Sequence, residues 1–120
     1  MSPVRHQISG AVLEFPLVGE MQRVRGELAP SETRIARTLV KEGPIRVTLV
    51  AVAAGGALHE HTAGGPVTIQ VLDGAIELDA AGRTWSAGPG TLLALEAGVP
   101  HAVRSPSGGM FLLTVVHEDR

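Results

Sequence analysis

The sequence predicts an all-β fold, either a sandwich or a jelly-roll barrel, on the basis of three observations. Short apolar segments rich in valine, isoleucine and leucine recur along the chain. Glycine and proline separate these segments, which is typical of strands and turns rather than of helices. The segments number about nine, as expected for a small jelly roll with additional edge strands.

The first two strands are expected at residues 34–40 and 45–53, on either side of a Lys-Glu-Gly-Pro turn at residues 41–44. Glycine and proline together favour a hairpin at this point. The two histidines at positions 59 and 61 are expected on a further strand. The remaining strands follow breaks such as Asp73-Gly74 and Gly88-Pro89-Gly90, and are expected at residues 67–72, 75–79, 83–87, 91–95, 101–104 and 110–116.

The length of 120 residues fits one domain with one hydrophobic core. We expect residues 1–33 to form an N-terminal segment with short strands or a helical turn, and residues 34–120 to form a single barrel. Residues 20–28 have some helical character, but Gly26 and Pro30 would shorten any helix there. The sequence therefore predicts a turn of helix at most in this segment.

The composition limits the classes of partner. Ten basic and twelve acidic residues, with a formal net charge of −2, are mixed along the chain and provide no basic surface for nucleic acid or an anionic membrane. The chain has no cysteine, so a transition-metal site would need nitrogen and oxygen ligands. The N-terminus lacks the apolar run of a signal peptide, and no segment has the roughly 20 apolar residues of a membrane helix. We expect a soluble, cytoplasmic protein whose partners include neither nucleic acid nor a membrane.

Three histidines form the candidate site. His59 and His61 are one residue apart, and alternate residues of a strand share a face. If His101 lies on a neighbouring strand, three neutral imidazoles can hold one metal ion and leave coordination positions open for water or substrate. The alternative is that they are three unrelated polar residues at strand ends. His6 and His117 lie near the termini, where solvated side chains are expected.

The residues around these histidines resemble the two sequence motifs of the cupin family. The similarity covers roughly residues 55–105. The matching positions are Gly55-Gly56, His59, His61 and Val71-Leu72-Asp73-Gly74 in the first motif, and Gly90, Gly98 and His101 in the second, with Glu96 in the place of a proline. This resemblance implies a double-stranded β-helix (jelly-roll) barrel of the cupin type, one metal held by the three histidines, and a homodimer paired through its sheets.

Two positions depart from the family pattern: Val67 replaces the glutamate of the first motif, and Ser105 stands where an asparagine is common. Without a carboxylate ligand, three imidazoles favour one divalent transition metal (Zn, Fe, Ni, Cu or Mn) over Mg or Ca. The amide of Gln70 is a possible replacement ligand. Strand alternation places Gln70 on the opposite face from Val67, so only a bulge between them would bring it to the histidines.

The rest of the pocket is expected to be aliphatic. We expect Val67, Ile69 and Val71 to line it, together with residues of the last strand among Met110, Leu112 and Thr114, of which Leu112 is the main candidate. The chain has two phenylalanines, one tryptophan and no tyrosine, so it offers little surface for stacking sugars or bases. A small apolar or carbonyl-bearing ligand fits this lining better.

Two functions follow from these features. The first is a metal-dependent enzyme, namely a dioxygenase, isomerase or lyase, that acts on a small oxygenated molecule. The second is a non-catalytic module that binds or senses a small molecule. Glu60 and Glu96 are expected to be solvated, and no catalytic residue is assigned.

Overall fold

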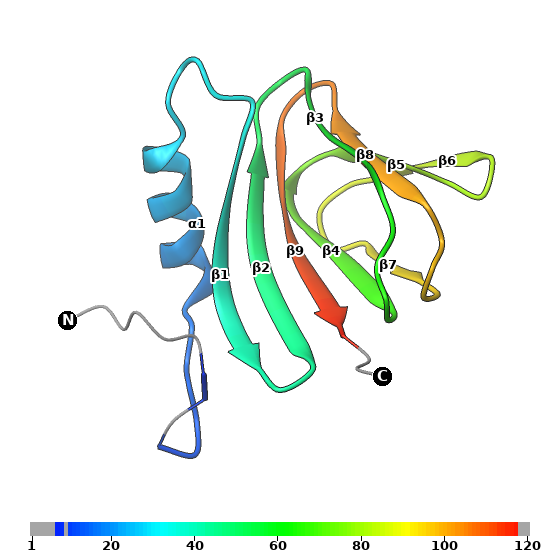
Figure 1. The fold of residues 1–120 in the computed structure, drawn as a ribbon. Helices are drawn as coiled ribbons and strands as arrows, with labels where there is room; N and C mark the ends of the chain where they lie inside the picture. The colour runs from blue at the N-terminus through cyan, green and yellow to red at the C-terminus, as the bar shows by residue number, and fades with distance from the viewer. Residues whose placement is uncertain (1–6, 9, 118–120) are drawn as a thin grey trace.

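The computed structural model describes residues 7, 8 and 10–117, and over these residues the chain forms one helix and nine strands (Figure 1). His6 and residues 118–120 lie outside the described residues. The helix and strands are α1 (Leu17–Glu27), β1 (Arg34–Glu42), β2 (Ile45–Val52), β3 (Gly56–His61), β4 (Val67–Gly74), β5 (Ile76–Ala80), β6 (Arg83–Ala87), β7 (Leu92–Leu95), β8 (His101–Ser105) and β9 (Gly109–Val116). Each strand range predicted from the sequence is confirmed to within two residues at either end.

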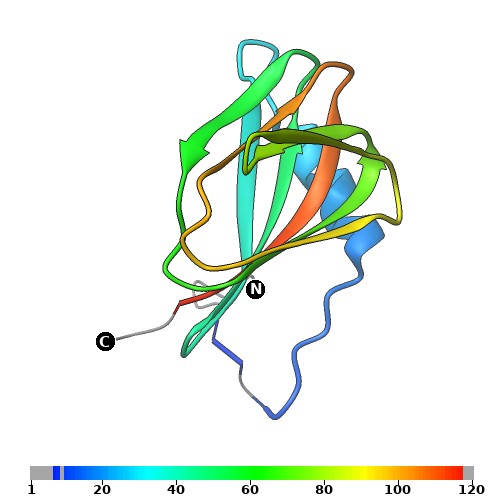
Figure 2. The same ribbon diagram turned by 90° about the vertical axis from the view of Figure 1, so that its right-hand side faces the viewer.

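The strands form two antiparallel sheets that face each other (Figures 1 and 2). One sheet has five strands in the order β1-β2-β9-β4-β7, and the other has four in the order β3-β8-β5-β6. Strands that are distant in sequence, such as β2 and β9, pair along their whole length. The predicted all-β jelly-roll barrel is therefore confirmed.

The barrel core lies between the two sheets. Alternate residues of β4, Val67, Ile69 and Val71, are at most 2% exposed. They pack with Val103 of β8 and Phe111 of β9 in one apolar cluster. Period-two alternation along each strand therefore directs one face of each sheet inward, and removal of this apolar surface from water stabilises the barrel.

Helix α1 corrects the prediction for the N-terminal segment, because it extends over 11 residues rather than one turn. Leu17, Met21 and Val24 recur at helical spacing and pack against the outer face of the five-stranded sheet. This packing compensates for the weak helix propensity of Gly26, which lies in the last turn. Within the part of the chain that the structure describes, no helix has the length and apolar character needed to cross a membrane.

Candidate metal centre

His101 begins β8 and is 2% exposed. Its Nδ1 lies 2.9 Å from the carbonyl oxygen of Val99. A carbonyl oxygen can only accept, so Nδ1 is the donor in this contact, and a neutral ring with this tautomer has its lone pair on Nε2. Metal-binding histidines typically have this arrangement, with one ring nitrogen held by a backbone carbonyl and the other directed to the metal.

Strand β3 places His61 directly opposite His101 in the β3–β8 ladder. Leu58 lies opposite Val103, so three steps along β3 correspond to two steps along β8. The extra residue is a β-bulge, and it interrupts the regular alternation from which a shared face for His59 and His61 was predicted. The side chain of His59 is exposed, and the side chain of His61 lies outside the described part of the structure.

Among the described side chains, no three His, Asp or Glu residues lie close enough together to hold a metal. Because this set does not include the side chain of His61, the three-histidine site of His59, His61 and His101 stays a prediction. The described features that fit a metal are the orientation of the His101 ring and the pairing of its backbone with that of His61.

Gln70 lies away from this site. Residues 67–70 pair without a register shift with both β7 and β9, so no bulge separates Val67 from Gln70. Val67 is 2% exposed in the barrel core, whereas Gln70 is exposed on the other face of the sheet. The possibility that Gln70 is a fourth ligand is therefore contradicted.

The predicted aliphatic lining is partly corrected. Val67, Ile69 and Val71 face the barrel interior, where they are fully packed core residues. Leu112 instead packs with the cluster beneath α1, as does Met110. The prediction that Leu112 faces the barrel interior was wrong, because Phe111, Leu113 and Val115 are the residues of β9 that pack against the barrel core.

A cavity of about 510 Å³ lies where the β5–β6 turn approaches β3 and the loop before β8. The residues lining it are Glu60, Asp79, Ala80, Ala81, Gly82, Arg83, Thr84 and Pro100. Glu60 is exposed as predicted, but its place in a cavity was not foreseen. The cavity depends on the approach of three segments distant in sequence, and the one local signal for it is the Ala-Ala-Gly turn at residues 80–82.

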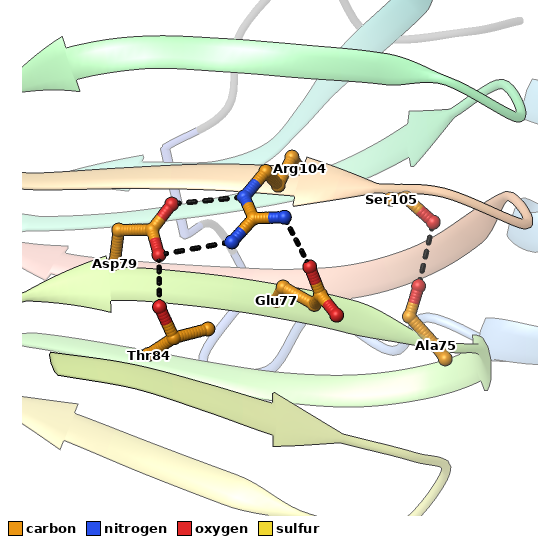
Figure 3. A network of polar contacts seen from close by, with 6 residues as sticks. All are labelled: Ala75, Glu77, Asp79, Thr84, Arg104 and Ser105. Carbon is orange, nitrogen blue, oxygen red and sulfur yellow. Dashed lines mark hydrogen bonds and ion pairs between the residues drawn. The ribbon is translucent and has the colours of Figure 1, made fainter.

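Arg104 organises a polar network next to this cavity (Figure 3). Its Nε donates to Oδ2 of Asp79 at 3.0 Å, and another of its nitrogens pairs with Glu77. The hydroxyl of Thr84 donates to Oδ1 of the same aspartate at 2.5 Å. The hydrogen bonds from Arg104, and then from Thr84, lower the pKa of Asp79 to about 2. Hydrogen bonding to Asp79 in turn raises the pKa of Arg104.

Ser105, which stands where the cupin motif commonly has asparagine, is completely buried. Its hydroxyl donates to the carbonyl oxygen of Ala75 at 2.5 Å (Figure 3). The side chain joins the end of β8 to the residue before β5, so a hydrogen-bonding residue at this position supports the four-stranded sheet.

Comparisons with known proteins agree with this architecture. The model of the family described as the cupin domain matches residues 46–117. A conserved protein of unknown function from Streptococcus pyogenes is similar in structure, with a TM-score of 0.72 and 22% identity over 100% of this chain and 98% of that one. A cupin superfamily protein from Desulfitobacterium hafniense gives a TM-score of 0.75 and 15% identity, over 98% of this chain and 100% of that one.

A third similar structure is the cupin domain of an XRE family transcriptional regulator from Enterobacter cloacae. It gives a TM-score of 0.66 and 21% identity, over 74% of this chain and 100% of that one. At these identities the structures establish the fold alone. No curated protein sequence matches the chain.

Proposed function

Because the chain belongs to the cupin family, we propose that it binds one divalent transition metal through His59, His61 and His101. The orientation of the buried His101 ring is the observation that carries this proposal, since Nδ1 contacts the carbonyl oxygen of Val99 and the proposal assigns coordination to Nε2. The register gives further support, because it brings the backbone of His61 opposite that of His101.

We propose further that the metal site belongs to an enzyme that acts on a small oxygenated molecule, as a dioxygenase, isomerase or lyase. A bound divalent ion would supply Lewis acidity, and a redox-active ion would also supply oxygen chemistry. In this proposal the three imidazoles hold the ion, and the aliphatic residues of β4 exclude water from its surroundings.

Metal analysis of protein purified without an affinity tag or chelator tests the site. Wild-type protein should contain one Zn, Fe, Ni, Cu or Mn ion per chain. Loss of a residue that only orients a metal ligand typically weakens metal binding by roughly 10- to 100-fold. Alanine at position 59, 61 or 101 would remove a ligand itself, so it should weaken Zn(II) binding by more than that. His117→Ala is the matched control and should bind normally, because His117 is exposed near the C-terminus. Stoichiometric metal in a folded His61→Ala variant would refute the shared site.

A binding or sensing module is the second candidate, and the chemistry of the barrel lining favours it. The buried polar residues in the described part of the chain are Glu20, His101 and Ser105. Glu20 lies on helix α1, outside the barrel, where it pairs with Arg37 of β1. In the barrel, Val67 occupies the position of the motif glutamate. The interior therefore contains no described carboxylate that could act as a general base. The similar cupin domain from a transcriptional regulator is consistent with sensing.

Oxygen uptake by the Fe(II)-loaded protein, measured with a panel of small keto and hydroxy acids, tests the dioxygenase alternative. Uptake that depends on one of these compounds would support a dioxygenase. Ligand binding without turnover, measured by calorimetry and by product analysis with Zn(II)-loaded protein, would support the sensing module instead.

The proposal also includes a cytoplasmic location and a homodimer. The absence of cysteine is consistent with a reducing compartment. Strand β1 is at the edge of the five-stranded sheet, where its outer backbone groups can pair with a second copy of the chain. Light scattering coupled to size-exclusion chromatography distinguishes a dimer from a monomer.

A further inference from the structure

A single row of paired residues crosses the four-stranded sheet from the candidate metal centre to Arg83. His61 pairs with His101, His101 pairs with Ala80, and Ala80 pairs with Arg83. Adjacent strands are separated by about 4.8 Å, so the backbones of His101 and Arg83 are about 10 Å apart across this row. The small side chain of Ala80 is the only one between them in the row.

Arg83 is exposed at the start of β6, and strand alternation together with its pairing with Ala80 places it on the barrel-facing side of the strand. His101 and Ala80, its neighbours in the row, are 2% and 9% exposed, respectively. Trp85, two residues further along the same face of β6, packs against the barrel core. The guanidinium carbon of Arg83 lies 4.8 Å from the centre of the Trp85 ring. This stacking holds the guanidinium against the ring of Trp85.

The guanidinium of Arg83 has no acceptor within the described protein. Every other described arginine makes a hydrogen bond or an ion pair. The guanidinium of Arg83 instead lies against the face of Trp85. Stacking uses the face of the guanidinium and leaves the N–H groups at its edge available for a planar carboxylate.

The cavity of about 510 Å³ joins Arg83 to the residue that precedes His101, because Arg83, Ala80 and Pro100 all line it. Two carboxylates, Asp79 and Glu60, line the same cavity. Arg104 and Thr84 engage the oxygens of Asp79, which leaves Glu60 as the acidic group that would oppose an anionic ligand.

We infer that Arg83 anchors the carboxylate of a small organic acid that binds beside the candidate metal centre. The contact is a bidentate ion pair between the guanidinium edge and the carboxylate. The inference deepens the proposed function by naming organic acids as the ligand class. The position of the acid beside a metal rests on the proposed function. The contact between Arg83 and the carboxylate does not itself require a metal.

Calorimetric titration with succinate tests the inference, with neutral succinamide as the comparison probe. Arg83→Gln should weaken succinate binding by at least about tenfold and leave Zn(II) affinity unchanged. Arg83→Lys should recover part of the affinity, since an ammonium cannot form the bidentate pair. Glu60→Gln should strengthen succinate binding because it removes a negative charge from the cavity. Arg23→Gln removes an equal charge from helix α1 and should have no effect.

The titrations are run on Zn(II)-loaded and on metal-free protein, so that the two proposals can fail separately. If Arg83→Gln and wild-type protein bind succinate equally, or if neither form of the wild type binds it, the inference about Arg83 is overturned. If the wild type binds no Zn(II) but binds succinate in a manner that depends on Arg83, the metal proposal fails and the carboxylate site stands.

Discussion

Glu20 of helix α1 accepts a hydrogen bond from Nε of Arg37 on β1, at a distance of 3.1 Å. The glutamate side chain is 11% exposed and the arginine side chain 29%. The pair joins the helix to the five-stranded sheet, next to the apolar contacts of Val24.

Removal of this pair should destabilise the protein. Glu20→Ala should lower the free energy of unfolding by about 1 to 2 kcal/mol, because it deletes a largely buried, charge-assisted hydrogen bond. A double-mutant cycle with Arg37→Ala, measured by urea unfolding, isolates the contribution of the pair. Arg23→Ala is the matched control, since Arg23 approaches Glu20 only at 4.0 Å and is half exposed. A coupling energy indistinguishable from zero would show that the helix is held by apolar contacts alone.

Val67→Glu restores the carboxylate of the cupin motif. Without metal, this change buries a carboxyl group among apolar residues and should destabilise the protein by about 3 kcal/mol. If the side chain reaches the metal, Mn(II) should restore stability and bind more tightly than to wild type. Thermal unfolding with and without Mn(II) measures both effects. Gln70→Ala is the control and should change neither, because Gln70 is exposed on the opposite face of β4. Failure of Mn(II) to stabilise the glutamate variant would place position 67 outside the metal site.

The low pKa of Asp79, about 2, predicts a particular pH dependence. The folded-state pKa is below the ordinary aspartate value of about 3.9. The stabilisation of the fold by ionised Asp79 is therefore complete above about pH 3.9, and it is lost as the pH falls through about 2. Asp79→Asn removes this contribution. The difference in unfolding free energy between wild type and Asp79→Asn, measured from pH 5 to pH 2, should therefore decrease below pH 4. A difference that stays constant over this range would mean that Arg104 does not hold the carboxylate in solution.

Gly74 should not tolerate a side chain. It has a φ angle of +68°, and an added Cβ would lie 2.2 Å from the carbonyl oxygen of Gly108. Gly74→Ala should therefore destabilise the protein by about 3 kcal/mol, since the clash is with backbone atoms. Gly43→Ala, at a φ of +52° in open space, should cost about 1 kcal/mol from backbone strain alone. Gly88→Ala, with open space and no positive φ, should be nearly neutral. Equal losses in all three, measured by chemical denaturation, would contradict a steric origin.

The sequence was sufficient to predict the strands because their signals are local. Glycine and proline mark the turns, and Val67, Ile69 and Val71 alternate with more polar neighbours, which identifies their inward face. The helix could not be predicted at its full length, because Met21 and Val24 gain most of their stabilisation from the sheet beneath them.

The candidate site could be predicted only in part, for two physical reasons. Residues 110–116 of β9 are almost continuously apolar, so no alternation indicates which of Phe111 and Leu112 faces the barrel. The bulge before His61 likewise has no local signal, since it is defined only by pairing with β8. The row that ends at Arg83 also depends on pairing between strands distant in the chain.

The bulge in β3 has a consequence for insertions and deletions in this family member. Two residues of β3 lie between Leu58 and His61. Only Ala102 lies between the residues of β8 that pair with them. Deletion of Glu60 would make the ladder regular and still leave His61 opposite His101. An insertion at the same place would add a second extra residue to β3. Either the bulge would have to become larger, or His61 would move out of register with His101. The segment is therefore asymmetric in its tolerance of length change: it can lose one residue more readily than it can gain one.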